Sequence, residues 1–359
     1  MSIKKSLFPA LLVCAVLALT LRLFARPASA QPVFDSGSYE EIDAYIEKQL
    51  DALNIPGASL AIIEGDQIVH VKGFGVSGPD GKGPTPQTPF MICSLTKSFT
   101  ALAVMQLVEA GKIELDAPVQ RYLPWFTLAD PQATAQVTVR HLLNQTSGLT
   151  QTTGWKTLVN FDDSPDSTEK QVRETEDMAH HLIAQLNGGR YGDVQILSPE
   201  GIAEMHSPAA KFTLMGTDMG DYGMGWFIEQ TSRGTLISHD GTAPDYFAYM
   251  ALLPDQNRGM VLLLNANEFF INMAFKFVGG DAALVLAGGQ PESIPWAAVP
   301  WSLRAFLIIP VLQVLGVFFT LRAVRRWRKD ASRRPGPIRK WFHIGLPAIP
   351  NLVLVFCAL

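Results

Sequence analysis

Phe90-Met91-Ile92-Cys93-Ser94-Leu95-Thr96-Lys97-Ser98-Phe99-Thr100 is the stretch around which the rest of the chain is organised. From Ser94 onward, apolar residues recur at three- and four-residue steps as far as Val108, and Gly111 supplies a stop, which predicts one buried helix. Lys97 follows Ser94 by three positions, so its amine shares a helical face with the serine hydroxyl. A buried lysine beside a helix N-terminus can be partly neutral, which makes this pair a candidate nucleophile and base.

The spacing alone does not decide the chemistry, because Ser-x-x-Lys occurs three times, also as Ser2 to Lys5 and Ser167 to Lys170. Only the copy at Ser94 is followed by an apolar helical face. The competing interpretation is that Ser94 caps a helix and that Lys97 is a solvated side chain, since capping is the common task of a serine at a helix start.

Composition limits the classes of function. With 359 residues, 48% of them hydrophobic, the chain can hold one large domain or two small ones, and a net charge of −4 argues against a nucleic-acid partner. Cys93 is the only cysteine outside the apolar ends, so we expect no disulfide in the domain and interpret Cys93 as a packed small residue. The histidines lack metal-binding spacing, and adjacent His180 and His181 point to different helical faces. We expect no metal and no cofactor.

Both ends of the chain suggest export to a membrane. Lys4 and Lys5 precede an apolar run, and Ala28-Ser29-Ala30 has the form of a signal-peptidase site. We predict a signal peptide over 1–30, with an uncleaved anchor as the alternative. Residues 305–321 carry no formal charge and precede a cluster of arginines, which predicts a span with the domain on the extracytoplasmic side of the cell membrane. A second possible span covers 342–359, within a membrane tail of 301–359.

Between these ends the pattern predicts an α/β (α+β) domain over 36–290, followed by a Pro-rich linker at 291–300. A helix at 39–53 precedes a hairpin of strands 58–63 and 67–73. Helices are expected at 115–123, 137–143, 177–186, 199–206 and 269–286, and strands at 222–230, 235–239, 246–253 and 259–265. Strands at both ends of the domain imply one antiparallel sheet flanked by helices, with the middle helices in a second lobe.

Four stretches carry a resemblance to a known family. They are Phe90 to Ser98, Arg140-His141-Leu142-Leu143-Asn144-Gln145-Thr146-Ser147-Gly148-Leu149, Tyr222-Gly223-Met224-Gly225-Trp226, and His239-Asp240-Gly241 with Leu252-Leu253-Pro254-Asp255. The chain resembles the serine β-lactamase and penicillin-binding protein family, in its class C β-lactamase, D-alanyl-D-alanine carboxypeptidase and esterase branch. The resemblance implies a β-lactamase/transpeptidase-like fold and a small-molecule or peptide substrate.

The resemblance also implies roles for individual residues. Ser94 would attack a carbonyl group to form an acyl-enzyme, with Lys97 taking its proton. The backbone N–H groups of Ser94 and Thr242 would hold the oxyanion. His239 would orient a substrate carboxylate or the serine hydroxyl, and Gly241 would keep the substrate close to the strand. The alternative for His239 is a half-buried strand histidine without a role in catalysis.

One motif of the family is missing. No tyrosine or serine in the chain is followed two positions later by asparagine, although the family carries such a motif in its helical lobe. The interval from Lys97 to His239 is also short, and the lobe lacks a block near Glu174-Thr175. We therefore expect a reduced helical lobe and impaired hydrolysis of amide or ester bonds in peptidoglycan-like peptides, β-lactams or small esters. The alternatives are a non-catalytic homologue that binds ligands in the cleft expected where the two lobes meet, and a truncated chain without function.

Overall fold

The computed structural model describes residues 39–149, 172–214, 217–267, 272–291, 299–330 and 336. The chain divides into two units, Met1–Asp35 and Ser36–Leu359, and every described residue lies in the second. The signal peptide expected at 1–30 lies outside the described residues, as do the other two Ser-x-x-Lys copies and the whole run at 342–359.

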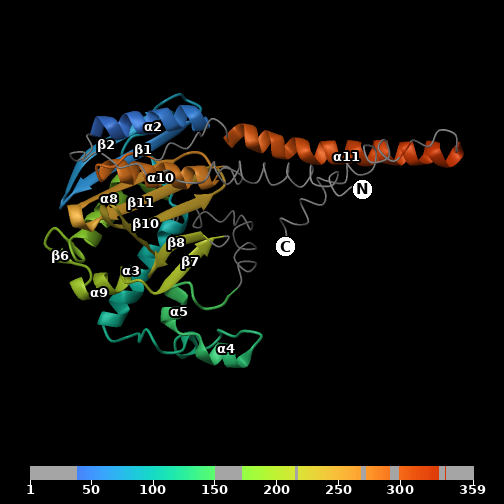
Figure 1. The fold of residues 1–359 in the computed structure, drawn as a ribbon. Coiled ribbons are helices and arrows are strands. Elements are labelled where there is room, and N and C mark those ends of the chain that lie inside the picture. The colour runs from blue at the N-terminus through green and yellow to red at the C-terminus, as the bar shows by residue number, and fades with distance from the viewer. Residues whose placement is uncertain are drawn as a thin grey trace. The chain divides into compact units, whose positions relative to one another are not determined.

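One antiparallel sheet forms the centre of the domain (Figure 1). In the described residues its strand order is β2-β1-β12-β11-β10-β9-β8-β7. The N-terminal hairpin, β1 (Gly57–Glu64) and β2 (Gln67–Gly75), joins the C-terminal strands through β1 and β12 (Arg258–Leu264), which pair from Ala58↔Leu264 to Glu64↔Arg258. The expected sheet, built from both ends of the domain, is confirmed. Both β1 and β12 are almost wholly apolar and buried, as central strands covered on two faces should be.

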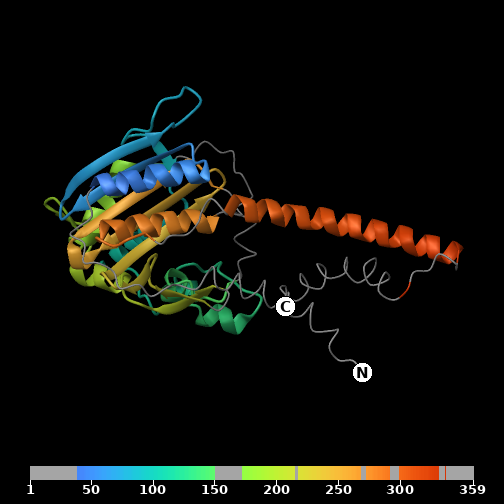
Figure 2. The same ribbon diagram turned by 45° about the horizontal axis from the view of Figure 1, so that its top comes forward.

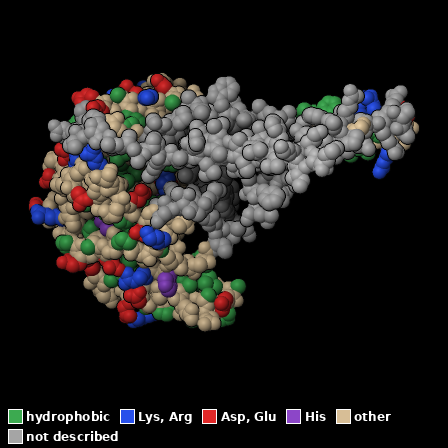
Figure 3. All heavy atoms as spheres, in the orientation of Figure 1, with side chains coloured by type: hydrophobic (Ala, Val, Ile, Leu, Met, Phe, Trp, Pro, Cys, Tyr) green, Lys and Arg blue, Asp and Glu red, His purple; other side chains and the backbone are tan. Residues whose placement is uncertain are grey.

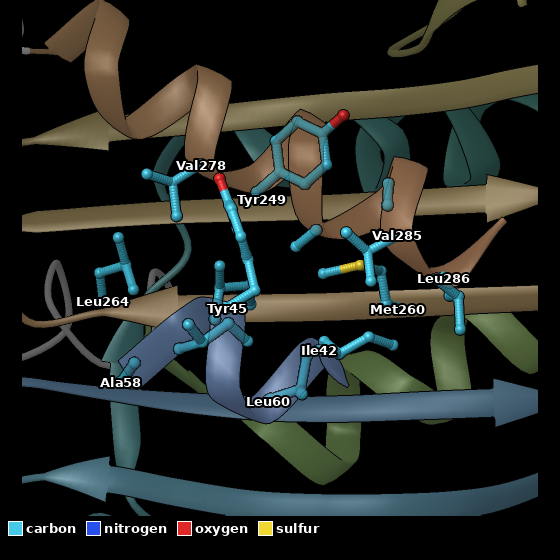
Figure 4. Packing of buried hydrophobic residues seen from close by; sticks show 14 of the residues in the cluster. Ile42, Tyr45, Ala58, Leu60, Tyr249, Met260, Leu264, Val278, Val285 and Leu286 are labelled. Atoms are coloured by element: carbon cyan, nitrogen blue, oxygen red, sulfur yellow. The ribbon is translucent and has the colours of Figure 1, made fainter. Parts of the chain in front are cut away.

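Helices cover both faces of the sheet. On one face α2 (Tyr39–Leu53) packs beside α10 (Asn272–Leu286), as Figure 2 shows from a second direction. Their apolar residues meet those of β1 and β12 in one core cluster (Figure 4). The Tyr45 hydroxyl in this cluster donates to the Asp281 carboxylate at 3.1 Å. The opposite face carries α8 (Thr175–Leu186), whose buried residues pack on β1 and β12. This second core holds the buried residues Leu95, Ala101 and Met105 from the segment that follows Ser94.

The C-terminal half of the sheet differs from the predicted strands. Residues 222–230 do not form one strand: β8 (Thr217–Tyr222) ends before Gly223, and β9 (Phe227–Thr231) begins after Trp226. Gly225 adopts a φ of +83°, which is incompatible with a continuous strand. The strand β10 (Gly234–Ala243) is longer than predicted, β7 (Ala210–Leu214) was not predicted, and β11 (Tyr246–Leu253) has the predicted bounds.

The second lobe is built from short pieces. They are η3 (Val119–Arg121), α4 (Pro131–Gln136), α5 (Val139–Leu143) and α9 (Pro199–Met205). A short hairpin follows α8; its strands, β5 (Arg190–Tyr191) and β6 (Val194–Gln195), have two residues each. In place of the proposed missing block, β4 (Val172–Glu174) pairs with β3 (Pro89–Met91), and α8 begins at the next residue. Thr175 Oγ1 then donates to Ser59 Oγ at 2.8 Å inside the core, so this junction is hydrogen-bonded and buried.

The run at 305–321 lies in helix α11 (Val299–Lys329). The helix does not end at Leu321 but continues through the basic cluster to Lys329. Among the helices of the described ranges, none combines the length and the apolar character that crossing a membrane requires. The span expected at 305–321 is therefore not supported.

The surface in Figure 3 carries acidic and basic side chains side by side over its described part. Several form ion pairs, such as Lys72 with Asp43 at 3.0 Å and Lys211 with Asp221 at 3.3 Å. Exposed pairs of this kind contribute little to stability individually.

Candidate active site

Ser94 lies in a single turn of 3₁₀ helix, η2 (Cys93–Leu95), and not at the start of an α-helix as predicted. The α-helix α3 (Thr96–Glu109) begins two residues later. Cys93 has a φ of +53°, a conformation that costs a non-glycine residue energy and interrupts regular helix. The Thr96 hydroxyl donates to the Cys93 carbonyl at 2.7 Å, which stabilises the tight turn. A backbone conformation that is rare for a non-glycine residue therefore directly precedes Ser94.

Lys97 and Ser94 are in contact, as their spacing predicts. Lys97 Nζ donates to Ser94 Oγ at 2.8 Å. Burial is the largest influence on Lys97 and lowers its pKa below the ordinary 10.5, while Asp240 and Cys93 act in the opposite direction. A lysine that is easier to deprotonate and already in contact with a serine hydroxyl is suited to accept the proton of that hydroxyl.

Strand β10 lies directly against the turn that carries Ser94. A Cβ atom at Gly241 would lie 2.3 Å from the Ile92 carbonyl oxygen and 3.1 Å from Cys93 Cβ. Only glycine allows this approach of strand and turn. The glycine therefore brings β10 to the serine, whereas the sequence assigned it to the approach of substrate. Thr242 follows on the same strand, so the two N–H groups expected to hold an oxyanion belong to elements in contact.

His239 lies two residues before Gly241 and points to the same face of β10. The side chain is buried, with 5% of its surface exposed. Burial is the main reason that its pKa falls to about 4; Lys97 and Lys276 lower it further, and Asp240 opposes them. Its Nδ1 lies 2.6 Å from the Asp240 carbonyl oxygen and its Nε2 lies 3.2 Å from the Tyr222 hydroxyl. Both ring nitrogens thus have partners within the protein, and the expected role of His239 toward substrate or serine stays a prediction.

The sequence does not identify Tyr222 as a site residue. The residue begins the stretch Tyr222-Gly223-Met224-Gly225-Trp226, which carries the family resemblance but assigns Tyr222 no catalytic or binding role. The structure brings its hydroxyl to His239 although the two residues belong to different strands.

The rest of that motif packs against the first turn of α3. A Cβ atom at Gly225 would lie 2.8 Å from the Lys97 carbonyl carbon and from the Ser98 nitrogen, so the loop touches the first turn of α3. Trp226 is fully buried beside it and stacks with His181, and the Ser98 hydroxyl lies 3.1 Å from His181 Nε2. These contacts hold the helix turn that carries Lys97 against α8.

Asp240 forms an ion pair that the sequence did not suggest. Its carboxylate lies 3.3 Å from Lys276 Nζ of α10, and the same ammonium lies 4.4 Å from the centre of the Phe227 ring. Asp240 also acts on the pKa of Lys97. The residue between His239 and Gly241 therefore contributes a negative charge, held by a cation, near the Ser94–Lys97 pair.

The second stretch of the resemblance has a structural role here. Arg140 binds the Asp116 carboxylate through Nε at 2.7 Å and Nη2 at 3.0 Å, and it also contacts Glu204. Through its two bonds to Asp116 and its contact with Glu204, the Arg140 guanidinium joins α5 to the segment before η3 and to α9. Within the described ranges, no three His, Cys, Asp or Glu residues are grouped as a metal site would require.

Comparison with known proteins gives consistent results. The family model described as Beta-lactamase matches residues 42–179 and 172–273, two segments that meet where the sequence indicates a missing block. Protein flp of Staphylococcus aureus is 35% identical over 113 residues, which are 31% of this chain and 23% of that protein. The teichoic acid D-alanine hydrolase of S. aureus is 30% identical over 168 residues, 46% of this chain and 39% of that protein. The chain thus spans well under half the length of these curated relatives.

Solved structures show the same fold. The octameric penicillin-binding protein homologue from Pyrococcus abyssi has a TM-score of 0.59 at 21% identity, covering 71% of this chain and 79% of that one. A class C β-lactamase from Rhodobacter sphaeroides has a TM-score of 0.50 at 15% identity, covering 68% and 96%. At these identities the likeness is one of fold.

Proposed function

The chain belongs to the β-lactamase family, and on that premise we propose that it is a serine hydrolase whose nucleophile is Ser94 and whose base is Lys97. The observation that carries the proposal is the 2.8 Å contact between Lys97 Nζ and Ser94 Oγ, made by a lysine whose pKa burial lowers. A serine that only caps a helix would not need such a partner.

The proposed reaction proceeds through an acyl-enzyme. Ser94 Oγ bonds to the substrate carbonyl carbon while its proton moves to Lys97 Nζ, and the N–H groups of Ser94 and Thr242 stabilise the oxyanion. The bond to the leaving amine or alcohol then breaks, and the leaving group takes the proton from Lys97. Water attacks the ester at Ser94, a proton returns to the serine, and the acid product leaves.

We propose that the substrates contain amide or ester bonds, in peptidoglycan-like peptides, β-lactams or small esters. The relative named teichoic acid D-alanine hydrolase adds D-alanine carried by teichoic acid to this group of possible substrates. The chain matches only 39% of that protein, so the relative supports the class of bond and leaves the choice of substrate to experiment.

We further propose that turnover is impaired because the chain lacks the Tyr-x-Asn motif. With Lys97 and His239 but without the tyrosine of that motif, the step that passes the proton to the leaving group or the step that activates water should be impaired. The absence of a general acid–base group costs about 3 to 5 kcal/mol if that group acts in the slowest step. Acylation should then be faster than deacylation, and the acyl-enzyme should accumulate.

The test is covalent labelling of the full-length chain with a fluorescent fluorophosphonate and with a fluorescent penicillin, followed by hydrolysis of p-nitrophenyl butyrate. We expect a label that Ser94→Ala abolishes and that Ser167→Ala leaves unchanged. Steady-state turnover should be far below the ordinary rate of about 10 per second. Labelling that survives Ser94→Ala would overturn the assignment, and ordinary turnover would show that the tyrosine is dispensable.

Two alternatives stay open to the same experiment. A non-catalytic homologue would bind the fluorescent penicillin reversibly, without a bond to Ser94. A truncated chain without function would neither bind nor be labelled.

The proposed location is the cell membrane, with the domain on the extracytoplasmic side. Its support comes from the sequence: the signal-like residues 1–30 and the basic cluster after Leu321.

A further inference from the structure

The hydrogen bonds of His239 define its protonation. The Asp240 carbonyl oxygen can only accept, so the ring nitrogen 2.6 Å from it, Nδ1, carries a proton. In a neutral imidazole the other nitrogen, Nε2, is then an acceptor. The Tyr222 hydroxyl, 3.2 Å from Nε2, is therefore the donor in this contact. The chain of bonds runs from Tyr222 through the ring to the backbone of β10.

Tyr222 is placed to remain a donor. It is the last residue of β8, 6% exposed, and its ring packs edge-on against Phe227 with centroids 4.9 Å apart. Burial first, and the charge of Asp240 second, raise the pKa of its phenol well above the ordinary value of 10. The hydroxyl keeps its proton across the pH range in which proteins are assayed.

We propose that Tyr222 is a positioning residue for the reaction at Ser94: its hydroxyl holds His239 as a neutral ring protonated at Nδ1, so that β10 presents no cation beside Lys97. This inference rests on the proposed function, because its consequence concerns proton transfer from Ser94 to Lys97. When Lys97 accepts that proton it becomes an ammonium ion. A second cation at His239 would oppose this charge in a buried site, where such repulsion is weakly screened.

The surroundings of His239 give Tyr222 this importance. Burial is the largest influence against protonation of the ring; Asp240 favours protonation, while Lys97 from α3 and Lys276 from α10 disfavour it. The Phe227 ring of β9, whose centroid lies 5.3 Å from that of the imidazole, is uncharged. Among the groups that face His239, Tyr222 alone donates a hydrogen bond to Nε2 in the described contacts, and this bond stabilises the neutral form specifically.

The first measurement does not depend on catalysis. Long-range ¹⁵N–¹H correlation spectra of the full-length chain, with His239 assigned by His239→Gln, report the tautomer and the titration of the ring. We expect a neutral ring protonated at Nδ1 at pH 7. Tyr222→Phe should move the titration of His239 upward by about one pH unit, the equivalent of one hydrogen bond. Tyr45→Phe, which removes a buried hydroxyl from the other core cluster, is the control and should change nothing at His239.

A wild-type ring protonated at Nε2, or a titration that Tyr222→Phe leaves in place, would overturn the inference. The wild-type tautomer is decisive even if the variant does not fold.

The second measurement is the pH dependence of fluorophosphonate labelling. In the wild type, the logarithm of the labelling rate should fall with a slope of about one as pH decreases through the titration of Lys97 alone. In Tyr222→Phe, His239 should gain its proton at a higher pH than in the wild type. As pH decreases through that value, the logarithm of the labelling rate should fall more steeply than in the wild type. Tyr45→Phe should follow the wild type. Parallel profiles for wild type and Tyr222→Phe, with the expected spectra, would refute the effect on Lys97. Absence of labelling in every variant, with the expected spectra, would refute the hydrolase and retain Tyr222 as the residue that holds His239.

Discussion

Lys97 is subject to opposing influences that decide whether it works as a base. Burial lowers its pKa, whereas the carboxylate of Asp240, itself held by Lys276, raises it. Burial is the larger influence. The proposed base is thus a lysine that loses its proton more readily than a solvated lysine does. The Ser94 hydroxyl, whose proton it would accept, lies 2.8 Å from Lys97 Nζ.

Lys97→Ala should slow labelling of Ser94 by roughly 100- to 10,000-fold, the effect of losing a general base. In the wild type the rate should rise with pH and reach a plateau at a pH below the ordinary lysine value of 10.5, because only the neutral amine accepts a proton. The measurement is the labelling rate from pH 5 to 10. Lys112→Ala is the control, since this exposed lysine follows the end of α3. A rate that is independent of pH and insensitive to Lys97→Ala would exclude this base.

At the scale of elements, the contact between β10 and η2 makes the site. The ladder between β9 and β10 ends at Ser238, while β11 accompanies β10 to Ala243. The segment from His239 to Ala243 is thus paired with β11 on one side and lies against the serine turn. Gly241 is the residue that permits this approach.

Gly241→Ala should abolish labelling of Ser94 and lower the melting temperature. The added methyl group would lie 2.3 Å from the Ile92 carbonyl oxygen, which is backbone and cannot move without displacing the turn. Gly78→Ala is the control, because its methyl group would meet only the Asp80 side chain at 3.9 Å. Thermal unfolding and labelling should be measured together, and a Gly241→Ala chain that labels at the wild-type rate would show that the close approach is not needed.

At the scale of the whole molecule, buried histidines couple folding to pH. Burial lowers the pKa of His181 to about 3 and the pKa values of His206 and His239 to about 4, against an ordinary value of 6.5. Above pH 6.5 these rings are neutral in both the folded and the unfolded chain. Below it the unfolded chain binds protons that the folded chain does not, so stability falls.

Acidification from pH 6.5 to 4.5 should therefore lower the free energy of unfolding by about 1.4 kcal/mol per pH unit for each of the three rings. His181→Gln should remove about one proton from this dependence, whatever it does to stability at pH 7. The measurement is chemical denaturation at half-unit intervals of pH. Equal slopes for wild type and His181→Gln would contradict a neutral, buried His181.

The proposed location also concerns the whole molecule. If the domain lies outside the cytoplasm, protease added to intact cells should degrade it, because nothing would shield it. A cytoplasmic protein expressed in the same cells is the control. Protection of the domain until the cells are broken would reverse the proposed orientation.

One antiparallel sheet, the helix that follows Ser94 and the contact of Lys97 with Ser94 are all predicted from the amino-acid sequence alone. These features depend on hydrophobic periodicity and on spacing within one helical turn, which are local properties. The bounds of β11 follow from its run of apolar residues, whereas the pairing of β1 with β12 is seen only in the fold.

Only the tertiary structure decided the surroundings of that pair. Tyr222 reaches His239, Lys276 reaches Asp240, and Gly241 admits the Ile92 carbonyl across distances in sequence that no periodicity describes. The left-handed backbone of Cys93, which moves Ser94 from an α-helix into a 3₁₀ turn, is likewise set by packing. Each of these features depends on which side chains meet once the strands are in register, so they arise only when the sheet has formed.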